Sequence, residues 1–374
     1  MSLRIAYFGT YDPGYARNRV LIDGLRAAGA EVVEYAAPLD SSLSAAQMAT
    51  KAGAGKLAGD LARAHLSLLA RHQRGVSFDV VIVGYPGHLL VPLAWTVARY
   101  HHAMLVFDPL VSLFDTFAGD RELVSGDSAA GHLTNVVDRV AFGLPDLVLA
   151  DTQAHASYYA TALDVPPAKL AVVPVGALPL PGARGAAREL APETPLRVVQ
   201  YGRWSPLHGL PIVLEAADEL RDEPFRFELI GDGQLASWLA DEVWRLRLEA
   251  VDLVESLPPW RLRARIVEAD VCLGVFGTSG KAARVLPNKV YDALAAGRPL
   301  VTEDSPAARE LLTHGRDALL VPAGDGRALA AALRRLRDDG ERARLGAAAL
   351  GLYRARCTPE AVAATLLAAL EDRV

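Results

Sequence analysis

Residues 274–299 read GVFGTSGKAARVLPNKVYDALAAGRP and follow the apolar run 269–273. This order predicts a strand, a glycine-rich loop, a short helix and a second strand. Pro287 has the fixed φ that suits the first position of a helix, and Gly297 is placed to end it. Three cations, Lys281, Arg284 and Lys289, lie in or near the loop. Free N–H groups at a helix start beside cations favour a phosphate, although such a loop is in many proteins only a tight turn.

The same strand, loop and helix order recurs along the whole chain. Predicted strands cover residues 4–8, 31–35, 79–83, 103–107, 147–150 and 170–175, and then 197–201, 225–230, 251–257, 269–273, 299–302 and 318–321. Helical patterns between strands favour parallel sheets. Residues 177–195 are rich in proline and glycine with little apolar periodicity, which indicates a linker. We therefore expect an α/β protein with Rossmann-like domains at 1–178 and 196–355, a linker at 179–195, and a last helix within 356–374.

Composition limits the class of protein. The 374 residues are 51% hydrophobic and 22% charged, enough for two sizeable cores. A net charge of −5 argues against a nucleic-acid partner. Cys272 and Cys357 form no metal or redox spacing, which favours a reducing compartment. The chain opens on a strand rather than a signal peptide, and no apolar run has the length of a bilayer span, so we expect a cytoplasmic protein.

Residues 43–75 are unusually basic. They are predicted to form one or two helices interrupted near Gly53 and Gly55. Five cations (Lys51, Lys56, Arg63, Arg71 and Arg74) and two histidines (His65 and His72) face a single acid, Asp60. The stretch is either an ordinary solvated helix face or a basic surface for an anionic acceptor or a membrane.

Polar residues follow several strands of the first half. His88 and Asp108 come just past strand ends, and the glycine-bearing loop 9–18 follows the first strand. Ligands of open parallel sheets bind at this edge. A lone histidine is often structural and an aspartate there often caps a helix. Two such groups at neighbouring strand ends make substrate contact an equal alternative.

Four motifs in order resemble glycosyltransferases of the GT-B fold, and glycosyltransferase family 4 most of all. They are Tyr201-Gly202-Arg203 with His208-Gly209, LIGDG at 229–233, PNKVYDALAAG at 287–297 and LVPAGD at 320–325. The resemblance is strong over 196–340 and looser over 1–178, through residues 84–88 and 108–121. It implies two Rossmann-like domains facing across a cleft, a C-terminal helix crossing back to the N-terminal domain, and closure about hinges at 177–195 and 354–358.

The resemblance implies an enzyme that moves a sugar from a nucleoside-diphosphate sugar to an acceptor, with retention of anomeric configuration. Arg203 matches the family arginine that faces the donor diphosphate, where a guanidinium stabilises the leaving group. No Asp-x-Asp motif occurs, so neither a metal nor any other cofactor is expected. The departing phosphate can itself act as base, which makes His88 and Asp108 less necessary as catalytic groups beside Arg203.

Two positions depart from the family pattern. His208 stands where the family has a lysine, and Lys281 or Lys289 could supply the missing charge. The paired glutamates, eight residues apart, fall on Arg284 and Asp292. Asp292 can still bind ribose hydroxyls, but Arg284 cannot accept a hydrogen bond from a sugar. We therefore expect a deoxysugar or an acidic sugar on the donor.

The resemblance also predicts the remaining donor-binding residues. They are Gly9, Thr10 and Gly14 in the first loop, Gly202 beside Arg203, Ser256 and Leu257 near the base, Thr278, Ser279 and Gly280 near the sugar, and Asn288 at the helix start. The acceptor is a small molecule, a lipid or a glycan. Two alternatives share the fold: a nucleotide-sugar 2-epimerase and a non-catalytic nucleotide-sugar binder.

Overall fold

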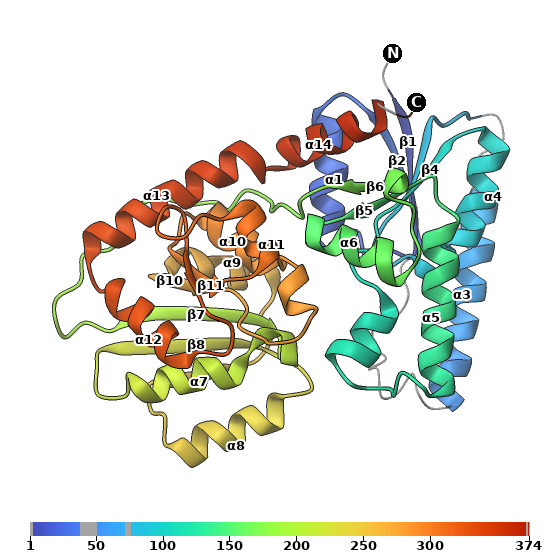
Figure 1. Ribbon diagram of the computed structural model, residues 1–374. Helices are drawn as coiled ribbons and strands as arrows, with labels where there is room; N and C mark the ends of the chain where they lie inside the picture. Colours follow the sequence, from blue (N-terminus) through green and yellow to red (C-terminus); the bar gives the residue numbers. More distant parts are fainter. Residues whose placement is uncertain (1–2, 38–50, 72–75, 372, 374) are drawn as a thin grey trace. The chain divides into compact units, whose positions relative to one another are not determined.

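The computed structural model describes residues 3–37, 51–71, 76–371 and 373, which divide into two compact units (Figure 1). Unit 1 comprises residues 1–174 and 359–374, and unit 2 comprises residues 175–358. The chain therefore leaves unit 1, completes unit 2 and returns to unit 1. Among the described residues, no helix is long and apolar enough to cross a membrane.

In the described part of unit 1, six parallel strands form one sheet in the order β2-β1-β3-β4-β5-β6. The strands are β1 (Arg4–Gly9), β2 (Glu31–Ala36), β3 (Val80–Val83), β4 (Met104–Phe107), β5 (Leu147–Ala150) and β6 (Leu170–Val172). The helices are α1 (Ala16–Ala27), α3 (Lys51–Arg71), α4 (Val91–His101), α5 (Ala129–Gly143), α6 (Gln153–Ala162) and α14 (Pro359–Glu371), with short turns η1 (His88–Leu90), η2 (Asp115–Asp120) and η3 (Pro167–Lys169). Side chains of α3, α4 and α5 share one core with the sheet.

In unit 2 the strand order is β12-β11-β10-β7-β8-β9, again all parallel over six described strands. The strands are β7 (Leu196–Arg203), β8 (Phe225–Asp232), β9 (Val251–Val254), β10 (Val271–Leu273), β11 (Leu300–Glu303) and β12 (Leu319–Val321). The helices are α7 (Leu210–Glu219), α8 (Ala236–Leu246), α9 (Pro259–Glu268), α10 (Asn288–Ala296), α11 (Pro306–Leu311), α12 (Gly326–Arg335) and α13 (Asp339–Arg356), with turns η4 (Pro206–His208) and η5 (Ala282–Arg284). Side chains of α7, α8 and α12 pack on one face of this sheet.

Helix α14 packs against α1 within unit 1. Gly24 lies at the contact, because a Cβ there would come 2.0 Å from the carbonyl oxygen of Pro359. The last helix of the chain and the first one are therefore in backbone contact, which only a residue without a side chain permits.

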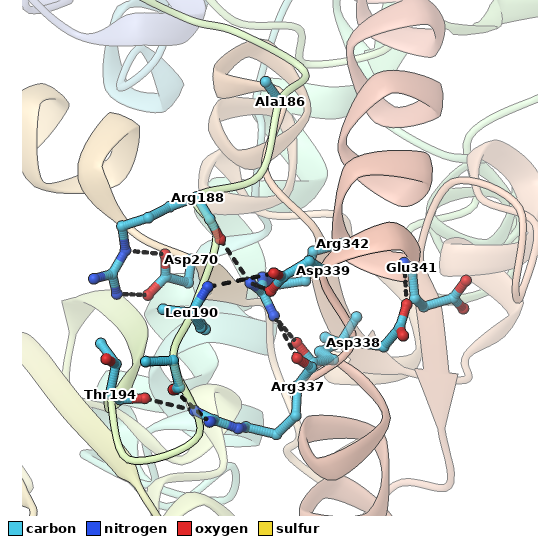
Figure 2. A network of polar contacts seen from close by, with 12 residues as sticks. Ala186, Arg188, Leu190, Thr194, Asp270, Arg337, Asp338, Asp339, Glu341 and Arg342 are labelled. Carbon is cyan, nitrogen blue, oxygen red and sulfur yellow. Dashed lines mark hydrogen bonds and ion pairs between the residues drawn. The ribbon is translucent and has the colours of Figure 1, made fainter.

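Arginines of unit 2 hold the chain that precedes β7 (Figure 2). Arg188 forms a two-point contact with Asp270, at 2.6 and 3.2 Å. Arg337 donates to the carbonyls of Thr194 and Pro192, at 2.6 Å each. The buried Arg342 donates to the carbonyl of Arg188 at 2.8 Å. Residues 188–194 have no helix or strand, yet they are fastened to unit 2 through these contacts.

Two local predictions were wrong. Helix α3 runs through Gly53 and Gly55 without interruption. Single glycines cost a helix only about 1 kcal/mol each, and the surrounding alanines and leucines are strong helix formers. Pro287 is the residue before α10 and not its first helical residue, since its ψ of 159° is extended. The remainder of the basic stretch, 43–50 and 72–75, lies outside the described residues.

Candidate functional site

At the carboxyl end of β7, side-chain nitrogens of His208 and Lys289 lie close to Gly202. Gly202 has a φ of +133°, which favours glycine. A Cβ at Gly202 would lie 3.4 Å from Nε2 of His208 and 3.6 Å from Nζ of Lys289. Because glycine has no Cβ, this position is open, and an imidazole and an ammonium group both border it. The place suits an oxygen atom of an anion.

Lys289 is buried, with 4% of its surface exposed. Its Nζ has no hydrogen-bond partner among the described residues and lies 5.9 Å from the centre of the Tyr201 ring. Burial lowers the pKa of Lys289 to about 7. A buried ammonium without a counter-charge is costly, and a bound anion would supply that charge.

Asp292 lies one turn further along α10 and is half-buried. It accepts a hydrogen bond from the hydroxyl of Tyr201. Burial raises the pKa of Asp292 to about 6, and the Tyr201 hydrogen bond opposes this rise. At neutral pH the group is a carboxylate held in place by β7, and its second oxygen suits a hydroxyl of a ligand.

The glycine-rich loop between β10 and α10 packs closely on its neighbours. A Cβ at Gly277 would come 2.6 Å from the carbonyl oxygen of Leu207, so the loop is fixed against η4. Arg284 folds back on the same loop, because a Cβ at Gly280 would lie 2.9 Å from its Nη1. Ser279 Oγ accepts from the backbone N–H of Ala282 at 3.2 Å. Lys281 is buried, whereas Gly280 and Thr278 are exposed.

The remaining predicted residues of unit 2 occupy the same edge of the sheet. Arg203 is the last residue of β7, exposed and paired in register with Asp232. Asn288 is the first residue of α10. Ser256 is exposed and Leu257 half-buried in the segment after β9. The structure thus brings Gly202, His208 and Lys289 together and places Gly280 against Arg284.

In unit 1 the first loop is tied to the loop after β3. Thr10 Oγ1 donates to the carbonyl of Pro86 at 2.8 Å, and Asn18 Nδ2 donates to the carbonyl of Tyr85 at 2.7 Å. Gly9 has a φ of +131°, and the N–H of Gly14 donates to Asp12 Oδ1 at 2.7 Å. The loop is therefore a built structure, and the donor contacts of Gly9, Thr10 and Gly14 stay predictions.

Asp108 is buried in a two-point ion pair with Arg17. The distances are 2.8 Å from Nε to Oδ2 and 3.0 Å from Nη2 to Oδ1, and both side chains are almost inaccessible. Both carboxylate oxygens are thus engaged. Arg17 also donates to the carbonyl of Pro174, so the pair joins the ends of α1, β4 and β6. A catalytic role for Asp108 stays a prediction.

His88 is buried in η1. Its Nε2 donates to the carbonyl of Val111 at 2.9 Å, and its Nδ1 has no hydrogen-bond partner among the described residues. Burial lowers the pKa of His88, although the Asp138 carboxylate 3.8 Å away opposes this. The neutral ring carries its lone pair on Nδ1, which is the tautomer of a proton acceptor. Its catalytic role also stays a prediction.

Three polar side chains received no role from the sequence, of which Arg17 and Glu303 are buried and Tyr201 is half-buried. Tyr201 orients Asp292, and Arg17 pairs with Asp108. Glu303 ends β11 with neither carboxyl oxygen hydrogen-bonded within the described chain, and burial raises its pKa to about 7. A charged residue closing an apolar strand, as at Glu303, was the available signal. Among the described residues, no group of three or more His, Cys, Asp or Glu side chains could hold a metal ion.

Residues 195–339 match the family model described as glycosyl transferases group 1. The amylovoran biosynthesis glycosyltransferase AmsK of Erwinia amylovora is 32% identical over 146 residues, which are 38% of this chain and 36% of AmsK. The chain spans less than half the length of the curated relatives it matches.

Two solved structures align over nearly all of both chains. HepE of Anabaena in complex with UDP-glucose has a TM-score of 0.69 at 17% identity, over 99% of this chain and 100% of HepE. Sucrose-phosphate synthase of Thermosynechococcus elongatus has a TM-score of 0.72 at 17% identity, over 99% and 98%. The chain therefore has the GT-B fold, and its residues 195–339 are similar to the glycosyl transferases group 1.

Proposed function

We propose that this protein is a glycosyltransferase that moves a sugar from a nucleoside-diphosphate sugar to a glycan acceptor. The observation that carries the proposal is the open position at Gly202, bordered by nitrogens of His208 and Lys289. AmsK is named as an amylovoran biosynthesis glycosyltransferase, and the HepE complex holds UDP-glucose. Both support a sugar nucleotide as donor and a glycan as acceptor.

The donor diphosphate lies over Gly202 in this proposal. Lys289 and His208 hold one phosphate, and the exposed Arg203 at the end of the same strand reaches the other. Arg203 presents a planar fork that matches two phosphate oxygens. Asp292 receives a hydroxyl of the ribose, with Tyr201 holding it in place. With the phosphates and the ribose placed in this way, the nucleotide base lies near the carboxyl ends of β8 and β9.

The reaction breaks the bond between the sugar C1 and the diphosphate oxygen, and forms a bond from C1 to an acceptor hydroxyl oxygen. The electron pair of the broken bond stays on the diphosphate, where Arg203 and Lys289 stabilise the charge. The acceptor proton passes to the departing phosphate oxygen on the same face, which gives retention. The cations at the diphosphate are then side chains of the protein, so transfer proceeds without added metal.

Arg284 defines the class of donor sugar. Its guanidinium lies against Gly280, in the loop that faces the sugar in this proposal. An arginine donates hydrogen bonds and accepts none, so it favours a sugar carrying a carboxylate over a neutral hexose.

The donor site is tested by thermal shift with UDP, GDP, dTDP and ADP. One nucleotide should raise the melting temperature, because it binds the folded protein alone. The shift should disappear in Lys289→Met and persist in Arg335→Met, which removes an exposed arginine of α12. No shift with any nucleotide, or an equal shift in Lys289→Met, would refute the donor site.

Release of free nucleotide separates transfer from the two alternatives on this fold. A transferase releases nucleoside diphosphate in proportion to added acceptor. A 2-epimerase keeps the nucleotide on its product and a non-catalytic binder breaks no bond, so neither releases nucleoside diphosphate in proportion to acceptor. Repeating the assay with excess EDTA tests metal independence, since turnover should persist.

We further propose a peripheral membrane contact through α3, in a cytoplasmic protein whose buried free cysteines stay reduced. Leu66 and Leu69 are exposed by 68% and 49%, and Lys56 and Arg63 are exposed on the same helix. Sedimentation with vesicles containing anionic lipid should carry the protein down, and Leu66→Ser with Leu69→Ser should keep it in the supernatant. Equal sedimentation of the double variant would exclude this surface.

A further inference from the structure

Helices α7 and α8 lie side by side on one face of unit 2 (Figure 1), and a groove of about 230 Å³ lies between them. Its lining combines apolar and acidic groups. Leu214 and Leu246 are apolar, Trp238 is aromatic, and Glu215, Asp218 and Glu242 are acidic. All of these residues lie outside the donor site described above.

Trp238 is the aromatic wall of the groove. It exposes 37% of its surface. An exposed indole presents a flat apolar face and one donor at its edge. The groove therefore offers a stacking surface and a hydrogen-bond donor side by side.

The acidic groups differ in what they already contact. Asp218 and Glu242 each pair with an arginine on their own helix or just beyond it, Arg221 and Arg245. Glu215 has neither a hydrogen bond nor an ion pair within the described chain, and its side chain rests against Gly326. A Cβ at Gly326 would lie 2.7 Å from Cδ of Glu215. Glu215 is thus an exposed acceptor at the α12 side of the groove lining, and both of its oxygens can accept.

The chemistry and size of the groove select one kind of occupant. Three carboxylates and no lining cation oppose a phosphate or another anion. The volume is smaller than the roughly 300–1,000 Å³ of pockets that hold drug-sized ligands, and much smaller than a trough for a helix. A sugar ring has an apolar C–H face for the indole, hydroxyls that donate to carboxylates, and oxygens that accept from the indole N–H.

We propose that the α7/α8 groove binds one sugar unit of a glycan, as a second carbohydrate site distinct from the donor site. Trp238 stacks on the sugar ring, and Glu215 accepts from its hydroxyls. The choice of a glycan as the polyhydroxyl ligand rests on the proposed function. Such a site holds a polysaccharide on unit 2 between transfers.

Affinity electrophoresis tests the groove with the 374-residue chain. Native gels contain dextran, galactomannan, xanthan or alginate, and retardation reports binding. The wild type should be retarded by at least one of these polysaccharides. Trp238→Ala and Glu215→Gln should weaken this binding at least fivefold. Trp244→Ala is the matched control on the same helix, since Trp244 is 83% exposed and does not line the groove.

The outcomes separate this proposal from the donor site. No retardation in any gel, or equal weakening in Trp244→Ala and Trp238→Ala, overturns the groove. The thermal shift with the preferred nucleotide is measured on the same variants and should be unchanged in Trp238→Ala. A nucleotide shift without glycan binding leaves the donor site and removes the groove. Glycan binding that depends on Trp238, without any nucleotide shift, supports the groove and refutes the donor site.

Discussion

Lys289 is a buried base whose pKa lies close to the pH of the cell. Burial lowers it from 10.5 to about 7, so near neutral pH about half of the empty molecules carry an uncharged amine. A bound diphosphate favours the charged form of Lys289, so Lys289 takes up a proton when the diphosphate binds. The neighbouring Asp292, with a pKa of about 6, is already ionised above pH 7 and leaves this proton balance unchanged.

The affinity for the donor should therefore fall as pH rises above 7. Between pH 7.5 and 8.5 we expect the Kd of the preferred nucleotide sugar to increase roughly tenfold, since one proton must be taken up. Calorimetric titration at several pH values measures this. In Lys289→Met, binding should be weak, with a Kd that is nearly independent of pH. The same slope in wild type and Lys289→Met would assign the proton to another group.

In the ligand-free protein, the lowered pKa of Lys289 makes the free energy of unfolding increase with pH, whereas the donor affinity decreases with pH. The unfolded chain binds a proton at Lys289 up to about pH 10.5, whereas the folded chain releases it above about pH 7. Burial of Lys289 thus destabilises the protein below pH 7, and this penalty is relieved as pH rises from 7 to 10. Urea unfolding should show a smaller gain with pH over this range in Lys289→Met than in wild type.

Arg284 allows a test of donor class by charge reversal. Wild type should bind UDP-glucuronate more tightly than UDP-glucose, because the guanidinium faces the sugar in the proposed site. Arg284→Glu should reverse this preference by about tenfold or more, since two charges about 4 Å apart near a surface attract or repel by about 1–4 kcal/mol. Competition titration with both sugars measures the ratio. An unchanged ratio would place the sugar elsewhere.

At the scale of elements, two helical glycines predict opposite effects of the same substitution. Gly24→Ala forces a Cβ against the Pro359 carbonyl, 2.0 Å away, and should cost about 1–3 kcal/mol as α1 and α14 move apart. Gly55→Ala meets no atom within 4 Å on the exposed side of α3 and should stabilise the helix by about 0.5–1 kcal/mol. Urea unfolding followed by circular dichroism gives both signs. A neutral Gly24→Ala would show that the two helices adjust without strain.

Much of the fold is readable from local patterns. Gly297 ends α10 with a φ of +63°, as the apolar periodicity and the following proline predict. The sequence did not indicate helix α5, because its apolar side chains do not all face the core. Leu133, Val136 and Val140 are 64%, 56% and 45% exposed, so the buried stripe is broken. Apolar periodicity identifies a helix by its buried face. When exposed positions are apolar too, the pattern no longer distinguishes the two faces.

The candidate site was predictable in its loops and less so in its contacts. Gly202, His208 and Lys289 were all selected from motifs, but their convergence needs the parallel packing of β7 and α10. Sequence left Lys281 and Lys289 as equal candidates for the missing cation. In the structure, the Nζ atom next to the Gly202 position is that of Lys289. Tyr201 was quoted in a motif but received no role, because a tyrosine in a strand is ordinary and its role depends on its hydrogen bond to Asp292.

At the scale of the molecule, Arg342 connects the segment before β7 with the helices of unit 2. It is 1% exposed and donates to the carbonyls of Leu336 at 2.6 Å, Arg337 at 3.0 Å and Arg188 at 2.8 Å. Arg342→Met should cost about 2–4 kcal/mol, because several buried carbonyls lose a charged donor. Arg335→Met removes an exposed pair with Glu341 and should change stability by less than about 1 kcal/mol. Equal melting temperatures for the two variants would deny Arg342 this role.

Unit 1 is built from two pieces of chain that are separated by the whole of unit 2. A ribosome makes residues 1–174 first, then all of unit 2, and only then the helix that covers α1. Gly24 and its apolar neighbours on α1 remain uncovered while the 184 residues of unit 2, 175–358, are synthesised. Domains that are contiguous in sequence fold in the order of synthesis. Here the later unit can finish before the earlier one, so the face of α1 that α14 covers stays exposed to chaperones until α14 has been synthesised.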